Sequence, residues 1–396
     1  MLTGGAEVAR AEDTVSRMAA ACGCARRDVY VTPTLIVGTF SADDGFSFTA
    51  SRRVDGAKGN MNQVEQANAL SRRFCAAPMP AAALHEEVER ITALPLYPAW
   101  VNLLASLLMA GAFAGVFGGS LSDSLGAALC GLAVWLAERV LRRIGMKDMI
   151  RTLLCSVMTG ILAVLMVKAG IARSADKTII GTIMLMIPGL ALVTALRDMI
   201  NGDLTSGVTE LLAALVRAMM IAVGTGLVLL WWKGRGFYDA TPAAVLPLVS
   251  RCLRLAIPCI LSTVSWAIVN EVRGPSKYAA MAAGSRAGFE LYLLVSSWTG
   301  SISAGVIAGA FFIMAFAEGA ARILKTPVIV LAVPMLIPLI PGGDLFYTTV
   351  NWVQENTAEA YIHLRLVGGE AGGIALAILM EASLAAVVFR HRHSGT

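Results

Sequence analysis

Two Ile-Pro-Gly sequences interrupt apolar stretches of the chain, at residues 187–189 and 340–342. Proline removes a backbone donor and glycine adds conformational freedom, so a helix that passes through either sequence is predicted to break there. Backbone amides freed at such a break, and the ends of the half-helices beside it, can bind a carboxylate or an ammonium group. The residues that carry this prediction are Pro188, Gly189, Pro341 and Gly342.

Charged residues inside apolar stretches form a second group that could do chemistry. Each costs roughly 2.5–3.5 kcal/mol at the centre of a membrane helix, so each one calls for an explanation. Glu381 lies near the middle of the last apolar stretch with no partner nearby in the sequence, which makes it a candidate proton carrier. Arg217, with Glu210 two turns earlier, is a candidate for proton coupling or, alternatively, part of a structural ion bridge. Arg286 and Glu290 are four residues apart and are interpreted as a structural ion bridge.

The sequence contains no motif typical of an enzyme or a metal site. It has no phosphate-binding loop, no GxGxxG and no GxSxG sequence. The helix around His85 begins like that of a zinc protease, but Glu89 stands where the second histidine is needed. The seven cysteines are scattered, and Cys22 and Cys24 are interpreted as small helix residues in a reducing compartment. We therefore predict a protein without enzymatic activity, metal or cofactor; a hydrolase with its chemistry in residues 1–95 is the weakest alternative.

The composition indicates that membrane helices must position these residues. Of the 396 residues, 57% are hydrophobic and 15% are charged, and the mean hydropathy is +0.69. An ordinary soluble domain is about 45–50% apolar and about 25% charged. This composition excludes an ordinary cytosolic enzyme, a DNA-binding protein and a disordered protein.

The first quarter of the chain differs from the rest. Residues 1–95 carry 10 Lys and Arg against 11 Asp and Glu, whereas the remaining 301 residues carry 22 against 16. Hydrophobic periodicity predicts a small soluble α/β domain that ends at Pro95 and Pro98, with a regulatory or structural role. Its predicted elements are an amphipathic helix at 3–22, two short strands within 28–40, a third strand at 46–54, and helices at 60–74 and 81–93.

The remaining three quarters contain ten apolar segments near the roughly 20 residues that a membrane span requires. These segments are 99–118, 121–141, 149–170, 178–196, 206–232, 253–272, 278–298, 300–318, 326–342 and 370–389. A break at 233–247 divides them into a first half (96–235) and a second half (236–396) of five spans each. Because five is odd, the two halves are predicted to be inverted relative to each other, with a broken fourth span in each. The fold class is thus an α-helical polytopic membrane protein with a small N-terminal α/β soluble domain.

Basic residues in the loops predict the orientation of this protein in the membrane. With the N-terminal domain inside, the inside loops carry eleven basic residues and the outside loops five to seven. Arg142, Arg143, Lys147 and Arg151 belong to the inside set. This bias places both termini in the cytoplasm.

At these residues the sequence resembles the threonine/serine exporter family (ThrE) in its fused two-half form. The run GGAEVARAEDTVSRMAAACG (4–23) is similar to the opening helix of that family, and VYVTPTLIV (29–37) and NQVEQANALSRR (62–73) to the elements that follow. Two first-half motifs match: Gly118-Gly119-Ser120 with Asp123, and Ile187-Pro188-Gly189 followed by Arg197-Asp198. The second-half motif is PLIPGGDLFY (338–347), which contains Asp344.

The resemblance implies a ten-span exporter of small amino acids in the bacterial inner membrane, driven by the proton gradient. Split relatives are associated with dicarboxylate export, so small dicarboxylates such as succinate are an alternative substrate, and a channel or scaffold without coupling is an alternative function. The expected partners are a small amino acid or carboxylate, the proton and the lipid bilayer, without nucleic acid; a homo-oligomer is left open. Helix caps and topology anchors are the ordinary alternative for Asp123 and Asp198. The candidate substrate-binding residues are Pro188, Gly189, Asp198, Pro341, Gly342, Asp344, Gly118, Gly119 and Asp123.

Overall fold

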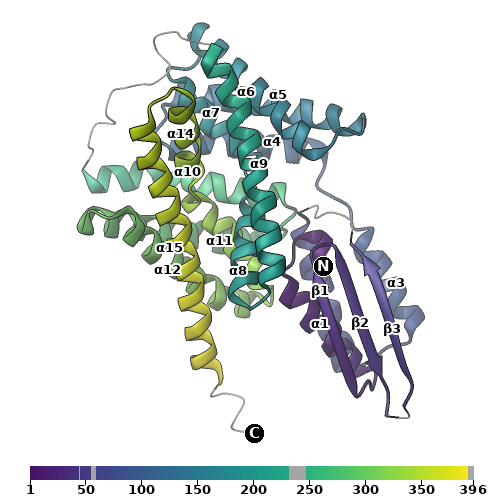
Figure 1. Cartoon of the computed structure of the whole chain (residues 1–396). Helices are drawn as coiled ribbons and strands as arrows, with labels where there is room; N and C mark the ends of the chain where they lie inside the picture. Colours follow the sequence, from purple (N-terminus) through teal and green to yellow (C-terminus); the bar gives the residue numbers. More distant parts are fainter. Residues whose placement is uncertain (44, 55–58, 232–246, 391–396) are drawn as a thin grey trace.

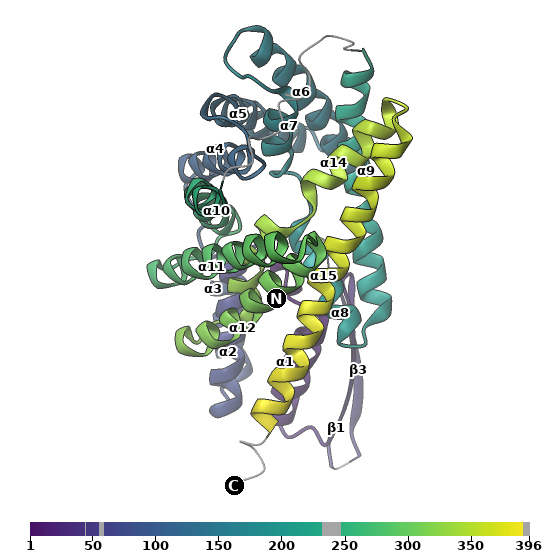
Figure 2. The same ribbon diagram turned by 90° about the vertical axis from the view of Figure 1, so that its left-hand side faces the viewer.

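In the computed structural model the chain is predominantly helical, with one small β-sheet near the amino terminus (Figure 1). The structure describes residues 1–43, 45–54, 59–231 and 247–390. The predicted break at 233–247 therefore lies almost wholly outside the described residues. The sheet and the helices next to it occupy one end of the molecule, and two long helices, α9 (Leu204–Trp231) and α15 (Thr357–Arg390), lie along its length (Figures 1 and 2).

The N-terminal elements lie close to where the sequence predicts them. Strands β1 (Arg26–Thr32), β2 (Leu35–Ser41) and β3 (Ser47–Arg53) form an antiparallel sheet in the order β1-β2-β3. The other elements are η1 (Leu2–Gly4), α1 (Val8–Ala21), α2 (Met61–Ala76) and α3 (Ala81–Thr92). Leu2, Val8, Ala11 and Val31 form a small buried cluster between this sheet and α1, and so fix the helix on the sheet.

Thirteen further elements follow within the described residues, and each predicted span has a helical counterpart. The first-half helices are α4 (Ala99–Val116), α5 (Leu121–Arg143), α6 (Asp148–Lys168), α7 (Ala175–Ile183), α8 (Gly189–Ile200) and α9. The second-half elements are α10 (Leu248–Val269), α11 (Pro275–Thr299), α12 (Ile302–Leu324), α13 (Val328–Leu336), η2 (Ile337–Leu339), α14 (Gly342–Val353) and α15.

Fewer than ten helices meet the length and hydropathy expected of a membrane span. Among the described residues, seven helices are long and apolar enough to cross a membrane: α4, α5, α6, α9, α10, α12 and α15. The α13–α14 pair, bent by 41° at its break, raises the number to eight. Helix α11 is long enough, but Arg286 and Glu290 in its middle lower its hydropathy, and α7 and α8 are each too short. The protein is a polytopic helical membrane protein; the ten-span arrangement remains a prediction.

The last elements of the two halves follow the same spacing. Helices α13, α14 and α15 begin 153 residues after α7, α8 and α9: at Val328 against Ala175, Gly342 against Gly189, and Thr357 against Leu204. Packing within each half corresponds as well. Helix α8 contacts α9 as α14 contacts α15, and α6 contacts α9 as α12 contacts α15. Contacts between the halves are reciprocal as well: α7 packs on α14 and α13 on α8, while α9 packs on α14 and α15 on α8.

Helix α13 lies at the centre of the main apolar core. Its residues from Ile329 to Leu336 are all buried, and α10, α11 and α12 surround it. A helix that is apolar on every side is enclosed by protein or by lipid, and the burial of α13 shows that protein encloses it here. The second broken segment is therefore held inside the protein.

Candidate functional site

The two Ile-Pro-Gly sequences adopt the same local conformation. Pro188 has φ −78° and ψ 57°, and Pro341 has φ −72° and ψ 46°. In each case the following glycine N–H donates to the carbonyl oxygen of the isoleucine, at 2.8 Å for Gly189 and 2.7 Å for Gly342. This is an inverse γ-turn, which the fixed φ of proline favours. Each turn ends one short helix and begins the next, so both predicted breaks are present.

The two breaks also contact each other. A Cβ added to Gly189 would lie 2.6 Å from Ile337 Cδ1 and 3.1 Å from Ile340 Cδ1. A Cβ added to Gly342 would lie 2.8 Å from both Ile187 Cδ1 and Met184 Sδ. Each glycine thus leaves room for the isoleucine of the other Ile-Pro-Gly sequence, and the two breaks form one reciprocal contact at the junction of the halves.

From this contact, α8 extends toward the N-terminal elements and α14 toward the opposite end of the molecule (Figures 1 and 2). Polar residues gather at both ends. Near the N-terminal elements, Thr194 on α8 donates to Glu210 on α9 at 2.8 Å. At the opposite end, the positions 153 residues later are Tyr347 and His363, whose rings lie 5.1 Å apart. Polar residues of α8 and α9, and of α14 and α15, therefore meet at corresponding places in each half.

The end near α14 joins three elements through charged groups. Lys177 on α7 donates to the Tyr347 hydroxyl at 2.7 Å, and that hydroxyl donates to Asp176 at 2.7 Å. His363 on α15 hydrogen-bonds Asp344 on α14 at 2.6 Å. Asp176 is almost fully buried, and Lys177 and Tyr347 supply the opposite charge and the hydrogen bond that a buried carboxylate needs. This outer cluster (Asp176, Lys177, Asp344, Tyr347 and His363) connects the first half to the second.

The end near α8 receives the amino-terminal segment of the chain. Arg197 on α8 pairs with Glu7 at 2.6 Å, and the Val8 N–H donates to Asp198 at 3.2 Å. Glu7 and Asp198 are 4% and 1% exposed, so the segment covers this end of α8 closely. Gly5 lies against Leu190 on the same helix.

Two more contacts fix the N-terminal elements on the second half. The Met61 N–H donates to the Asn270 carbonyl at 3.0 Å, and Glu65 forms an ion pair with Lys277. The N-terminal elements thus bridge the two halves on one side of the molecule. On the face of α1, burial and then the neighbouring Asp203 carboxylate raise the pKa of Glu12, while the Val31 backbone N–H lowers it.

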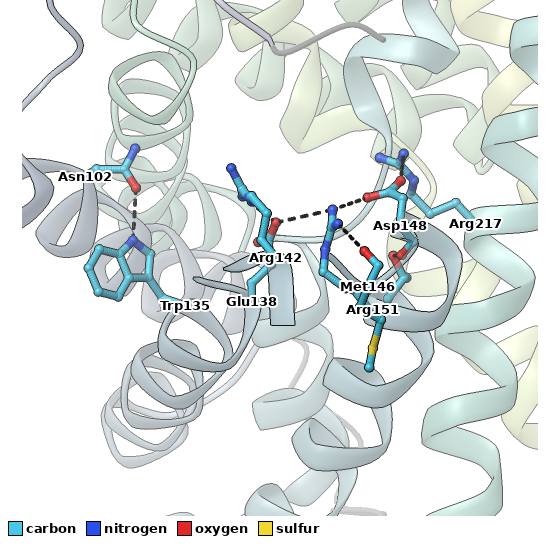
Figure 3. A network of polar contacts seen from close by, with 9 residues as sticks. Asn102, Trp135, Glu138, Arg142, Met146, Asp148, Arg151 and Arg217 are labelled. Carbon is cyan, nitrogen blue, oxygen red and sulfur yellow. Dashed lines mark hydrogen bonds and ion pairs between the residues drawn. The ribbon is translucent and has the colours of Figure 1, made fainter. Parts of the chain in front are cut away.

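A third charged network connects α5, α6 and α9 (Figure 3). Arg151 donates to Asp148 at 2.5 Å and lies 4.0 Å from Glu138. Arg217, in the middle of α9, forms an ion pair with Asp148, and Arg142 pairs with Glu138 at 2.7 Å. Beside this network, Trp135 Nε1 donates to Asn102 at 3.0 Å and so holds α5 on α4. Arg217 therefore has a partner 69 residues away, which the sequence did not reveal.

Comparison with known protein families accounts for most of the chain. Residues 1–232 match the family model described as threonine/serine exporter, and residues 255–384 match a second model, described as Threonine/Serine exporter, ThrE. The chain belongs to the threonine/serine exporter family. Both models fall in one chain in the order of the two halves, so this member has the fused two-half form. No curated protein and no solved structure matches the chain. The family name describes transporters rather than enzymes.

In this exporter-family chain, the Gly118-Gly119-Ser120 turn follows Phe117, whose ring would lie 2.7 Å from a Cβ added to Gly343, next to the second break. Gly118 has φ +86°, and a Cβ on Gly119 would lie 2.7 Å from the Ala114 carbonyl oxygen, so the tight turn from α4 to α5 requires both glycines. Asp123 forms a capping box with Ser120 and accepts the N–H groups of Arg173 and Ser174, each at 2.8 Å. These contacts anchor the segment that leads into α7.

The other candidate residues are dispersed. Pro188, Gly189, Pro341 and Gly342 lie at the central contact, while Asp344 lies in the outer cluster. Asp198 lies at the opposite end, under the amino-terminal segment. Glu381 is 5% exposed on α15, and the charges acting on it come from Glu318, Arg197 and Arg322, so it has charged neighbours in space. Within the described residues, no three His, Cys, Asp or Glu side chains could together hold a metal ion.

Sequence reasoning missed the partners of these residues. The loop charges predict Arg151 in a cytoplasmic loop, whereas it lies on α6 and pairs with Asp148, which also pairs with Arg217. One signal was available: an arginine within an apolar helix needs an opposite charge on a neighbouring helix. Asp176, Lys177 and His363 gave no comparable signal because they lie near the ends of helices, where charges are ordinary.

Proposed function

We propose that the chain is a secondary active exporter of threonine and serine, coupled to the proton gradient across the bacterial inner membrane. Family membership supports the substrate class. The observation that carries the mechanism is the contact between Gly189 and Ile340, and between Gly342 and Ile187, which brings the two broken segments together. In transporters, discontinuous helices in corresponding positions of two halves surround the substrate.

We propose further that the halves, 96–235 and 236–396, are inverted repeats. The equal spacing of 153 residues and the reciprocal packing of α7, α8 and α9 with α13, α14 and α15 support this arrangement. An inverted pair allows the two halves to rock against each other around a central site, which is exposed to one side of the membrane at a time. The basic residues of the loops support an orientation with both termini in the cytoplasm.

In this scheme, the polar contacts at the two ends act as gates. The contact of Thr194 with Glu210 closes the cytoplasmic end, where the N-terminal domain (1–95) covers α8. The outer cluster closes the other end. Glu210, Arg217 and Glu381 remain the candidates for proton coupling, and His363 joins them because it hydrogen-bonds Asp344 at the outer end.

The test is transport by the purified chain in proteoliposomes. Labelled threonine, serine and succinate are offered with and without a pH gradient, and with an uncoupler. The proposal expects threonine and serine flux that the gradient accelerates and the uncoupler reduces. Flux of succinate alone would identify a dicarboxylate exporter instead, and flux indifferent to the gradient would identify a channel. No flux of any of the three under any gradient would overturn the proposal.

A further inference from the structure

A cavity of about 90 Å³ lies within the charged network of α5, α6 and α9. Its polar lining comes from Glu138, Asp148, Arg151, Thr152 and Arg217, and Leu185, Met186 and Cys155 complete the wall. A single water needs roughly 10–15 Å³ of such space, so the cavity has room for several waters or a small solute.

Arg151, which lines the cavity, has one donor without a hydrogen-bond partner among the described residues. Arg151 Nε is buried and has no hydrogen-bond partner, although the two terminal nitrogens of the same guanidinium donate to Met146 and Asp148. A buried unsatisfied donor costs about 1–3 kcal/mol, more when it is charged. Because Nε itself is buried, a group in the cavity would meet this guanidinium through its terminal nitrogens.

The charged side chains that line the cavity are balanced in number, and Arg142 pairs with Glu138 from outside the lining. Two carboxylates, on Glu138 and Asp148, face two guanidiniums, on Arg151 and Arg217. A guanidinium binds a carboxylate through two parallel hydrogen bonds, and a carboxylate binds an ammonium group equally well. A zwitterion leaves this balance unchanged, whereas a dicarboxylate adds two negative charges to it. The lining is therefore complementary to the head group of an α-amino acid.

The position of the cavity links it to the first break. Leu185 and Met186 form part of its wall, and Ile187 follows directly, in contact with Gly342. A movement of the broken segment would therefore reshape the cavity. The second half has Glu370 at the position 153 residues after Arg217. The repeat architecture consequently does not require an arginine at this position.

We infer that this cavity binds the head group of the transported amino acid, with Arg151 and Arg217 receiving its carboxylate and Asp148 and Glu138 its ammonium group. The inference rests on the proposed function and selects between its two substrate classes: it favours a zwitterion over a dicarboxylate. On binding, the substrate carboxylate replaces Asp148 as the partner of one guanidinium. The substrate ammonium group then pairs with the Asp148 carboxylate that this exchange has freed. The bridge between α6 and α9 then passes through the substrate.

The test is ligand binding to the purified full-length protein, measured by calorimetry. The probes are L-serine, its methyl ester, which lacks the carboxylate, 3-hydroxypropionate, which lacks the ammonium group, and succinate. Arg151→Gln and Arg217→Gln are expected to weaken serine binding about tenfold or more. Asp148→Asn is expected to lower the preference for serine over 3-hydroxypropionate and succinate by about the same factor. That ratio compares ligands on the same protein, so it is unaffected if part of the sample is misfolded.

Arg286→Gln is the matched control. It breaks an Arg–Glu pair at 2.9 Å on α11, outside the cavity, and is expected to leave all four affinities unchanged. If the wild type binds and transports serine and the three cavity variants behave like this control, the inference is wrong and the proposed function stands. If the wild type neither binds nor transports any amino acid, both are overturned.

Discussion

Gly189 packs against Ile340, and Gly342 packs against Ile187, so each Ile-Pro-Gly sequence supplies the glycine that accommodates the isoleucine of the other. The two sequences are 153 residues apart, and their prolines share one backbone conformation. This relationship requires that the two halves meet at their breaks. The first two predictions test it directly.

The reciprocal glycine contact predicts a specific rescue. Gly189→Ala places a Cβ 2.6 Å from Ile337 Cδ1, and overpacking of this kind costs about 1–3 kcal/mol. Ile337→Val removes that Cδ1 atom, so the double variant is expected to recover most of the lost stability. Thermal unfolding in detergent and serine flux in proteoliposomes measure both effects. Gly342→Ala with Ile187→Val tests the other side of the contact; equal stability of single and double variants at both sites would contradict the packing described.

The prolines are expected to be needed for transport rather than for membrane insertion. Replacing Pro188-Gly189 and Pro341-Gly342 with Ala-Ala restores an amide donor and favours a continuous helix in place of the turn. We expect flux to be lost while the protein still inserts and purifies. Pro258→Ala, within α10, is the matched control because it changes a proline outside the breaks. Undiminished flux in the variant with all four alanines would show that the breaks have no part in transport.

The ion pair between Glu7 and Arg197 is expected to hold the amino-terminal segment on α8. Glu7→Gln leaves the partly buried Arg197 without its opposite charge, and the loss of one partner costs up to about 3–5 kcal/mol when a pair is fully buried. The single variant should release the N-terminal domain to limited proteolysis faster than the wild type. Adding Arg197→Met removes the unpaired charge and should restore part of the protection. Unchanged proteolysis of the single variant would mean that other contacts are sufficient.

Glu12 predicts a pH dependence of stability. Because burial and Asp203 raise its pKa above the ordinary 4.5, the folded protein binds this proton more tightly than the unfolded chain does. The contribution of Glu12 is therefore fully present below about pH 4.5 and is lost as the pH rises through the raised pKa. Glu12→Gln should increase the melting temperature at about pH 8 and leave it unchanged at about pH 4. The exposed Glu86→Gln is the control, and a pH-independent difference for Glu12→Gln would refute this account.

Asp123 is expected to stabilise the fold. It accepts two backbone N–H groups at the start of α7 and closes a capping box, and each hydrogen bond to a charged group is worth about 1.5–3 kcal/mol. Asp123→Ala should lower the melting temperature strongly, whereas Asp123→Asn, which keeps one acceptor, should lower it less. The affinity for serine should be the same in whatever fraction of either variant folds. A selective loss of affinity in a stable Asp123→Asn protein would instead assign it to substrate binding.

The sequence by itself determined those features of this protein that depend on residues close together along the chain. Its apolar runs indicated membrane helices, its β-branched stretches indicated the three strands, and its two Ile-Pro-Gly sequences indicated the breaks, because proline and glycine act on the backbone where they stand. The family motifs of the N-terminal domain and of both halves could also be recognised from the sequence. The sequence did not predict α14, because the apolar segment 326–342 ends at Gly342, where α14 begins.

Only the tertiary structure decided which residues meet. Asp148 and Arg217 are 69 residues apart, Glu7 precedes α1 whereas Arg197 lies on α8, and Gly189 meets an isoleucine of the other half. Apolar periodicity states that a helix has a buried face, but not which helix covers it. That choice depends on the shapes and charges of all helices packing together, and it is there that the cavity between Arg151 and Arg217 arises.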